Sequence, residues 1–286
     1  MFQRAARHVL LGSPAELFAD SVVASRCLLE SLESRNEPPI KKTRVVLVSS
    51  FGVYGVASLR RGARIDEQTP LERLPEKRDT YSHAKLWQEQ MFWRHQHQSG
   101  FELVVLRPGV IYGPGGGAFS NRVGLQIGST FFHLGGRNLL PLSFVVNCAE
   151  AIVFAGTHPS SAGEAYNVHD DDLLTASQYL RQYRKKVRNV RSIHLPYFAT
   201  HTLAWLLEKY HDHSHGQLPP VITRYKVASM WGGNRFDNGK LRGLGWRQLV
   251  DTPDALAQTL QDMRRRQEVA PPRTTDVAHM KTATNA

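Results

Sequence analysis

The sequence predicts an α/β fold whose centre is a parallel sheet. Val45 to Val48 form a short, fully apolar run of mostly β-branched residues, which is typical of a strand buried on both faces of such a sheet. A helix with an apolar stripe is expected after Tyr81, and Gly100 is expected to end it. A second strand is expected from Phe101 to Leu106. Strand, helix and strand therefore follow one another in the order that a parallel sheet requires.

Chemically competent residues gather at the predicted end of the first strand. Ser49 and Ser50 stand where that strand stops, and open α/β sheets bind their ligands at the carboxyl ends of their strands. Tyr81 and Lys85 are four residues apart, which places both on one helix face, one turn apart. A tyrosine has a pKa of about 10, and a lysine cation nearby is expected to lower it. Such a tyrosine could exchange a proton with a substrate oxygen that a serine hydroxyl also binds.

Chance is the competing explanation, because a tyrosine and a lysine at this spacing are common in helices. The surrounding sequence makes chance less convincing, since the strand ends in two serines and Tyr54-Gly55 follows four residues after Ser50. The segments VVLVSSFGVYG, YSHAK and LVVLRPGVIYGPG together resemble the extended short-chain dehydrogenase/reductase family, which includes NAD-dependent sugar epimerases and dehydratases and 3β-hydroxysteroid dehydrogenase-like enzymes. The resemblance continues through PLSFVVNCAEAI, GEAYNVHDDD and RFDNGKLRGLGW, and covers the chain from Leu17 to about Arg266.

The resemblance implies a Rossmann-type sheet, a bound NAD or NADP, and a set of site residues. The implied catalytic residues are Ser50, Tyr81 and Lys85, and the implied cofactor-binding residues are Tyr81, Lys85, Pro108, Gly109 and Val110. Lys85 would also hold the nicotinamide ribose, and the backbone from 108 to 110 would border the nicotinamide. Ser50 is preferred over Ser49 because the family serine lies four residues before the tyrosine that Tyr54 matches. Ser21 occupies the place of a family asparagine that supports the tyrosine and lysine.

The strand, glycine-rich turn and helix that hold the cofactor pyrophosphate in this family are not recognisable before Val45. We therefore expect a Rossmann domain that lacks its amino-terminal half, an unpaired strand edge, and weak or no cofactor binding. A fragment, a start placed too late and a degenerate relative are all compatible with this pattern. Gly113 to Ala118 formally fits the dinucleotide fingerprint, but it follows a late strand, contains Pro114 and has no acidic residue about twenty positions on. It is interpreted as a flexible loop beside the substrate.

The chain is divided into a partial NAD(P)-binding domain at 1–170, a smaller substrate domain at 171–266 with a contribution from 113–140, and a disordered tail at 267–286. Several local structures are expected along it. They are a helix capped by Ser13 and buried against the sheet through a wide apolar stripe, a polar loop at 36–42, a cap pair of Asn147 with Glu150, a strand at 166–168, a helix at 175–184, an apolar helix at 198–207 packed in the small domain, and a loop containing His211, His213 and His215.

Composition limits the classes of function. The formal net charge is +11, but the basic residues are scattered, so a solvated surface is favoured over nucleic-acid binding. The two cysteines, Cys27 and Cys148, give neither a disulfide framework nor a zinc motif, and no metal site is expected. There is no signal peptide and no apolar run of eighteen residues, so a cytoplasmic protein without a transmembrane segment is expected. A homodimer is an open option.

The predicted function is NAD(P)-dependent oxidation and reduction of a secondary alcohol or ketone, with a small-molecule substrate. A nucleotide-sugar epimerase or dehydratase and a non-catalytic relative are the alternatives. By resemblance, sugar-nucleotide enzymes carry an arginine about ten residues before the aspartate of a D-x-x-K segment, here Asp237 to Lys240, and Val227 is close to that position. With the apolar run from Phe198 to Leu207 nearby, this favours an apolar alcohol, although Arg224 and Lys226 leave a charged substrate open.

Overall fold

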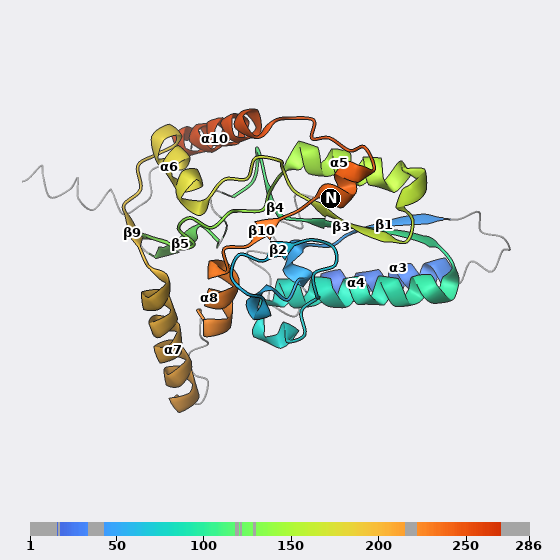
Figure 1. Cartoon of the computed structure of the whole chain (residues 1–286), viewed down its shortest axis with the longest axis horizontal. Coiled ribbons are helices and arrows are strands. Elements are labelled where there is room, and N and C mark those ends of the chain that lie inside the picture. The colour runs from blue at the N-terminus through green and yellow to red at the C-terminus, as the bar shows by residue number, and fades with distance from the viewer. Residues whose placement is uncertain are drawn as a thin grey trace, which may run out of the picture.

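The computed structural model of the chain describes residues 16, 18–33, 43–117, 120, 122–127, 130–214 and 222–269. It is a mixed α/β structure in which helices lie on both sides of a parallel sheet (Figure 1). No helix within the described residues is both long and apolar enough to cross a membrane. The predicted cap at Ser13, the loop at 36–42, His215 and residues 270–286 of the predicted tail lie outside the described residues.

Three parallel strands form the central sheet. They are β1 (Arg44–Val48), β3 (Glu102–Pro108) and β8 (Glu164–Val168), in the order β1-β3-β8. Val48 pairs with Leu106 and Leu106 with Tyr166, so the carboxyl ends of the strands meet at one edge. The predicted strands at 45–48, 101–106 and 166–168 are therefore confirmed. Among the described strands β1 pairs with β3 alone, so the other edge of β1 has no described strand partner.

The two faces of this sheet are covered by different helices. Below the sheet in Figure 1 lie α3 (Ala24–Glu33) and α4 (Thr80–Ser99), and above it lies α5 (Val145–Thr157). The helix predicted after Tyr81 is confirmed, and Gly100 ends it in a left-handed conformation with φ 72°. Leu29 packs with Leu47 and Phe92 under the sheet.

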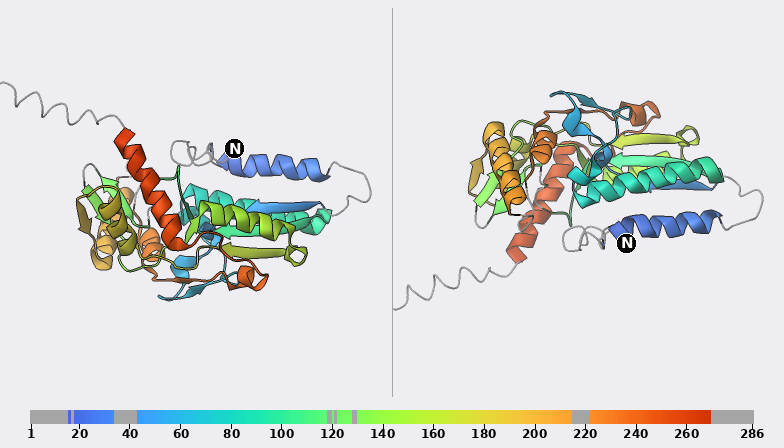
Figure 2. Two further views of the ribbon diagram at one scale, coloured as in Figure 1. Left: turned by 90° about the horizontal axis from the view of Figure 1, so that it is seen from above. Right: turned by 90° about the horizontal axis from the view of Figure 1, so that it is seen from below.

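The amino-terminal helix is less buried than its apolar stripe predicted. It begins with a π-helical turn, η1 (Ala19–Val23), and continues as α3, which runs alongside α4 in Figure 2. Leu29 is fully buried, but Leu28 is 49% exposed and Val23 is 53% exposed. The stripe is wide enough to surround most of the helix, whereas the described neighbours cover only one side of it.

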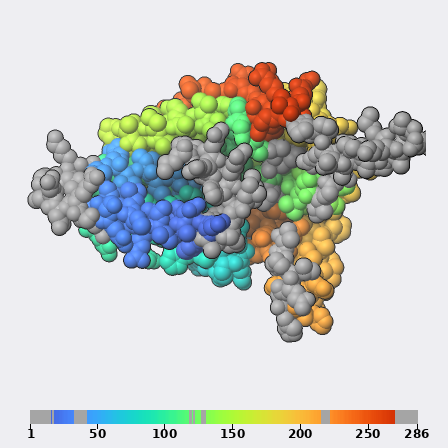
Figure 3. Space-filling view, turned by 180° about the vertical axis from the view of Figure 1, so that it is seen from behind, coloured from blue at the N-terminus to red at the C-terminus, as the bar shows by residue number. Residues whose placement is uncertain are grey.

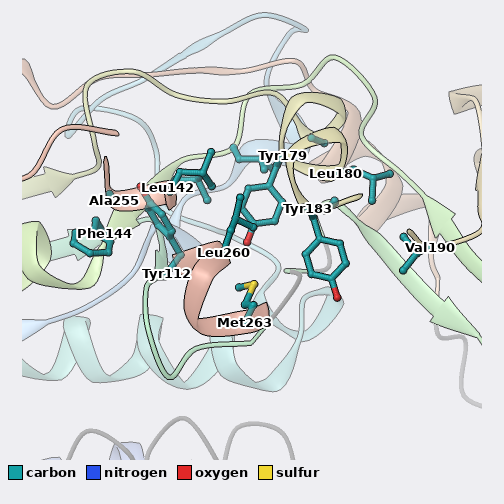
Figure 4. Packing of buried hydrophobic residues seen from close by; sticks show 14 of the residues in the cluster. Tyr112, Leu142, Phe144, Tyr179, Leu180, Tyr183, Val190, Ala255, Leu260 and Met263 are labelled. Carbon is teal, nitrogen blue, oxygen red and sulfur yellow. The ribbon is translucent and has the colours of Figure 1, made fainter. Parts of the chain in front are cut away.

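A second core lies beyond the carboxyl ends of the sheet strands. Tyr112, Leu142 and Tyr179 pack there with Leu260 and Met263 (Figure 4). The elements that supply or border this core are β4 (Val110–Tyr112), β5 (Gly124–Ile127), β6 (Thr130–His133), β7 (Leu142–Phe144), α6 (Ala176–Lys186), β9 (Ser192–His194) and α10 (Thr252–Val269). The predicted helix at 175–184 is confirmed as α6, and Thr175 and Gln178 form a capping box at its start.

The remaining elements join this region to the sheet. They are β2 (Arg64–Ile65), η4 (Pro75–Lys77), α7 (Tyr197–His213), α8 (Arg224–Trp231), β10 (Arg235–Phe236) and α9 (Gly239–Gly243). β2 and β10 pair in parallel, so the long connection before Tyr81 is tied to the carboxyl-terminal part of the chain. Tyr225 of α8 also donates a hydrogen bond to Glu72 of that connection.

Helix α7 corrects one prediction and limits another. It runs to His213, so His211 and His213 belong to its last turn and not to a loop. It contacts α8, within the predicted small domain, but it packs along one side only and projects from the body of the molecule in Figure 1 and at the lower edge of Figure 3. Only Thr200 and Ala204 of this helix are buried, whereas Phe198 is 72% exposed.

Two further local predictions are wrong. Asn147 does not cap a helix, because α5 already begins at Val145; its buried amide instead donates to Asp170 and accepts from the backbone of Val250. Glu150 accepts a hydrogen bond from the indole of Trp246 and makes no cap either. The predicted tail begins too early, because α10 continues to Val269.

Candidate active site

The two serines after β1 have different surroundings. The Ser49 side chain is buried and its Oγ donates to Glu89 Oε2 at 2.5 Å. Ser50 begins the 3₁₀ turn η2 (Phe51–Val53), where its Oγ accepts the N–H of Gly52 at 3.0 Å. The Ser50 hydroxyl is also close enough to the Tyr81 phenol to lower its pKa. Of the two serines, Ser50 is therefore the one that reaches Tyr81, while Ser49 is engaged below the sheet.

Tyr81 lies in the first turn of α4, whose start is well defined. Asp79 is the cap residue, and its carboxylate accepts from both the backbone N–H and the Oγ of Ser82 at 2.9 Å. Burial raises the pKa of Tyr81 above its ordinary value, Ser50 lowers it, and the Asp79 charge raises it again. Burial is the largest of these effects. The expectation of a lowered pKa is therefore reversed, and the phenol is protonated at neutral pH.

Lys85 is one turn beyond Tyr81, as the spacing predicted, but its ammonium group is engaged elsewhere. Its Nζ donates to the carbonyl of Val48 at 3.0 Å and to Gln88 Oε1 at 2.9 Å. Burial lowers the pKa of Lys85. These bonds hold the cation against the last residue of β1, so its charge is not among the groups that shift the pKa of Tyr81.

Sequence reasoning missed two residues, Gln88 and Ser25, which link Lys85 to the amino-terminal helix. Gln88 donates through Nε2 to Ser25 Oγ at 2.6 Å and to the carbonyl of Ser21 at 3.2 Å. Ser21 therefore acts through its backbone, and the connection to Lys85 runs through Gln88. The signal that could have found Gln88 is its position three residues after Lys85, on the same helix face.

The backbone from Pro108 to Val110 crosses the carboxyl edge of the sheet. Gly109 donates to the carbonyl of Val168 at 3.0 Å, and Val110 donates to that of Pro141 at 2.6 Å. A Cβ on Gly109 would lie 2.0 Å from the Pro141 carbonyl oxygen, so only glycine fits. This stretch is close to the Phe51 ring, which follows Ser50 directly. Its role beside a nicotinamide stays a prediction.

A buried ionic network underlies the site and was not predicted. Arg107 of β3 forms an ion pair with Glu89 of α4, and their side chains are 6% and 0% exposed. Arg107 also donates to the Tyr54 hydroxyl at 2.9 Å, and that hydroxyl donates to Asn167 Oδ1 at 2.6 Å. The network joins α4 to β3 and β8, and through Ser49 to the end of β1.

The structure of the glycine-rich stretch at 113–117 supports the conclusion that it is not a dinucleotide fingerprint. Residues 113–117 lead toward β5 and not into a helix. The backbone N–H of Gly115 donates to Asp262, and Arg266 donates to the carbonyl of Gly116, so α10 holds this turn. Ala118 lies outside the described residues.

Metal-binding chemistry finds no support in the described part of the chain. No group of three or more His, Cys, Asp or Glu side chains there is arranged to hold a metal ion. Cys27 is exposed and Cys148 is buried, and both are free thiols.

A cleft of about 510 Å³ opens between η4 and the start of α8. It is lined by Glu76, Lys77, Arg78, Glu208, Thr223, Arg224, Tyr225 and Lys226. Val227 is fully buried, as expected of a core residue, but Glu208 is the sole α7 residue of this lining. The apolar residues of α7 therefore do not line this cleft.

Comparison with solved structures shows the same fold in several proteins. The structure of gox2253 covers 91% of this chain and 75% of its own, with 17% identity and a TM-score of 0.66. RMD from Pseudomonas aeruginosa, solved with NADPH, covers 89% and 76%, with 17% identity and a TM-score of 0.60. UDP-glucuronic acid 4-epimerase from Bacillus cereus, solved with UDP-glucuronic acid and NAD, covers 86% and 67%, with 16% identity and a TM-score of 0.59.

The sequence comparisons differ in what they find. No curated protein is similar enough to the chain to match it. The profile of the family described as NAD dependent epimerase/dehydratase matches residues 4–168, which is more than half of the chain and includes the strand, the two serines and the Tyr81 helix. The chain therefore belongs to the NAD-dependent epimerase/dehydratase family.

Proposed function

We propose that the chain is an NAD(P)-dependent oxidoreductase that interconverts a secondary alcohol and a ketone through Ser50, Tyr81 and Lys85. One observation carries the proposal: the Ser50 hydroxyl, at the carboxyl end of β1, is close enough to the Tyr81 phenol in the first turn of α4 to lower its pKa. Two adjacent O–H groups at that edge can bind the same substrate oxygen. Lys85 follows one turn further along α4.

The direction of the Tyr81 pKa shift defines its role. Because burial keeps the phenol protonated, Tyr81 acts as the acid that donates a proton to a carbonyl oxygen during reduction. The Ser50 hydroxyl donates a hydrogen bond to the same oxygen as negative charge develops on it. Lys85 is held in place by Val48 and Gln88, one turn away. A nicotinamide, when bound, supplies or accepts the hydride.

The described residues fit the nicotinamide end of such a cofactor. A Cβ on Gly52 would lie 2.8 Å from Ser82 Oγ and 3.4 Å from Ser50 Oγ, so the glycine leaves the space beside the Ser50 hydroxyl free. Tyr81 and Lys85 would hold the ribose, and the backbone at Gly109 would border the ring. For the pyrophosphate, no glycine-rich turn within the described ranges leads from a strand into a helix amino terminus.

Substitution of Tyr81 tests the proposal. Tyr81→Phe is expected to lower kcat/KM by about a hundredfold or more, because general acid–base groups contribute roughly 10²–10⁴ in rate. The assay follows NAD(P)H absorbance over a panel of ketones and secondary alcohols, with the cofactor at millimolar concentration. Tyr210→Phe, on the exposed part of α7, is the matched control and should be unchanged. A near-normal rate for Tyr81→Phe would show that the role is wrongly assigned.

A nucleotide-sugar epimerase or dehydratase is the second candidate. The cationic lining of the cleft beside α8 favours it, because Arg78, Arg224 and Lys226 could face phosphate oxygens. Turnover of a UDP- or GDP-sugar without activity on simple ketones would favour this candidate over the first. Absence of turnover in both panels, with cofactor shown to be bound, would indicate a non-catalytic relative.

A further inference from the structure

Helix α7 presents an apolar surface to its surroundings. Five large apolar side chains of this helix are each at least 38% exposed, namely Phe198, Leu203, Trp205, Leu206 and Tyr210. Exposed apolar side chains that occur singly are ordinary, but five on one projecting helix of 17 residues form a patch (Figure 1). The helix is about 25 Å long. A patch of this kind on the outside of a protein indicates a surface that meets a partner.

Two neighbouring charged residues show how the sides of α7 are oriented. Glu208 forms an ion pair with Arg224 of α8, so this acidic side chain is turned toward the body of the protein. Lys209 lies over the ring of Trp205, with its Nζ 4.6 Å from the ring centroid, and both residues are exposed. Asp212, the other acidic residue of the helix, lies in its last turn. A lysine stem beside an indole suits the boundary between water and lipid, because each side chain has an apolar body and a polar end.

A basic surface precedes α7 in the chain. Residues 173–207 contain neither Asp nor Glu. They contain six Lys and Arg residues, all of them exposed, which we call the basic patch: Arg181, Arg184, Lys185, Lys186, Arg188 and Arg191. The six positive charges are therefore not offset by any acidic residue of the same stretch.

Hydrogen bonds fix the basic patch close to α7. Arg184 donates to Asn189 Oδ1 at 3.2 Å and to Ser192 Oγ at 3.4 Å, which ties the end of α6 to β9. β9 pairs with β6, and α7 begins at Tyr197, shortly after β9 ends. Helices α6 and α7 lie at the same end of the molecule in Figures 1 and 3. The apolar surface and the basic patch therefore belong to one end of the protein.

The helix packed against α6 does not neutralise the basic patch. Gln267 of α10 donates to the hydroxyl of Tyr183 of α6 at 2.8 Å, which places the end of α10 beside α6. The acidic residues of that end are paired within the helix, Asp262 with Arg266 and Glu268 with Arg264. This part of α10 therefore brings as many cations as anions to the surface, and the third arginine, Arg265, adds a further positive charge.

Charge and apolarity together select the kind of partner. A second copy of the chain related by a two-fold axis would bring two basic patches toward each other, and like charges repel. A nucleic acid would use the positive charges and leave the apolar side chains of α7 in water. A bilayer with anionic headgroups uses both, because a helix of this type buries its apolar side at the headgroup boundary while nearby lysines and arginines face the headgroups.

We propose that α7 and the basic patch dock the chain on the surface of a membrane that contains anionic lipids. α7 would lie in the plane of the interface, with Phe198, Trp205 and Leu206 among the lipids. No helix of the described residues can cross a bilayer, so the contact is peripheral. The proposal concerns a surface away from Ser50 and Tyr81 and does not depend on the proposed function.

Vesicle co-sedimentation of the full chain tests the electrostatic part. Binding to phosphatidylcholine vesicles with about one third phosphatidylserine should be at least tenfold tighter than binding to phosphatidylcholine alone, and added salt should weaken it. Lys186→Glu reverses one charge of the basic patch and should weaken the binding about tenfold or more. Arg94→Glu, at an exposed position on α4 at the other end of the molecule, is the matched control and should bind as the wild type does.

The contribution of α7 is tested separately. Phe198→Ser should weaken vesicle binding about tenfold, because the ring no longer enters the apolar region. Leu249→Ser, at a position that is 68% exposed and outside α7, is the matched control. Both variants should unfold at the wild-type temperature, since neither side chain is buried. Trp205→Phe should bind vesicles but lose the blue shift of tryptophan emission that the wild type shows on binding.

Four outcomes would overturn the proposal. They are no binding to the anionic vesicles, equal binding to the neutral ones, wild-type binding by Lys186→Glu or Phe198→Ser, and a blue shift that persists in Trp205→Phe. Dimerisation in sedimentation velocity that Phe198→Ser abolishes, without vesicle binding, would assign the surface to a second copy instead. Binding of a random oligonucleotide that Lys186→Glu weakens and Phe198→Ser leaves intact, again without vesicle binding, would assign it to nucleic acid.

Discussion

The buried pair of Glu89 and Arg107 allows a quantitative prediction. Glu89→Gln removes the charge but keeps the shape of the side chain, and it leaves the Arg107 guanidinium buried without a counter-ion. Breaking such a pair costs about 3–5 kcal/mol. We expect about 3 kcal/mol, because the glutamine Oε1 can still accept from Arg107, and Arg107 keeps its bond to the Tyr54 hydroxyl. The loss corresponds to a decrease in Tm of roughly 6–12 °C.

Urea unfolding followed by fluorescence and circular dichroism measures this loss of free energy. The matched control is Glu268→Gln, which removes the exposed partner of Arg264, where both side chains are at least 60% exposed. That change should cost no more than about 0.5 kcal/mol. The combined change Glu89→Leu with Arg107→Met removes both charges, and it should recover more than half of the single-variant loss because no unpaired charge is left.

Two results would refute the reasoning about this network. A loss for Glu89→Gln no larger than that of Glu268→Gln would mean that the pair is hydrated and not buried. A double variant less stable than Glu89→Gln would mean that the charges themselves stabilise the fold. Because Ser49 donates to Glu89, the same variants also report whether the strand end that carries Ser50 depends on the network.

The remaining predictions concern pH, capping and the cofactor. Burial lowers the pKa of His133 below its ordinary value, so its contribution to stability is complete above about pH 6.5 and is lost as the pH falls toward the folded-state value. His133→Gln should therefore flatten the decrease in Tm that is measured between pH 7 and pH 5. An unchanged dependence of Tm on pH would contradict this prediction. Thr175→Ala removes the cap of α6 and should cost about 1 kcal/mol in urea unfolding, whereas Thr202→Ala, on the exposed face of α7, should cost less. Calorimetric titration of the 286-residue chain with NAD(H) or NADP(H) should give binding weaker than micromolar, and tighter binding would show that the pyrophosphate is held by other means.

Elements with strong local signals could be predicted from the sequence. The apolar run at Val45 to Val48 is a strand because three of its four residues are β-branched and all four suit a buried sheet position. Gly100 ends α4 because glycine tolerates the left-handed conformation there, and Thr175 with Gln178 makes a capping box from residues three apart. In each of these cases the atoms that interact are close in sequence, so pattern and structure have the same cause.

Contacts between distant segments could not be predicted in this way. Asn147 looked like a cap because Glu150 follows it, but its partners, Asp170 and Val250, are 23 and 103 residues away. The pairing of Arg107 with Glu89 likewise depends on how α4 crosses β3. The exposure of α7 is a further example, since an apolar sequence shows that a surface should be covered and does not show by which segment.

The candidate catalytic pair, Tyr81 and Lys85, has one property that local sequence predicts and one that depends on contacts with distant segments. Its positions follow from sequence, because residues four apart on a helix must lie one turn apart, and Tyr81 and Lys85 do. Its chemistry does not, because the Tyr81 pKa depends on a balance between burial, the Ser50 hydroxyl and the surrounding charges. Lys85 is withdrawn from that balance by the Val48 carbonyl and by Gln88. A tyrosine in this state is protonated at neutral pH and can donate to a ketone oxygen, but it is a weaker acid than an ordinary phenol, so proton transfer would become easier if Lys85 left these partners and approached the phenol.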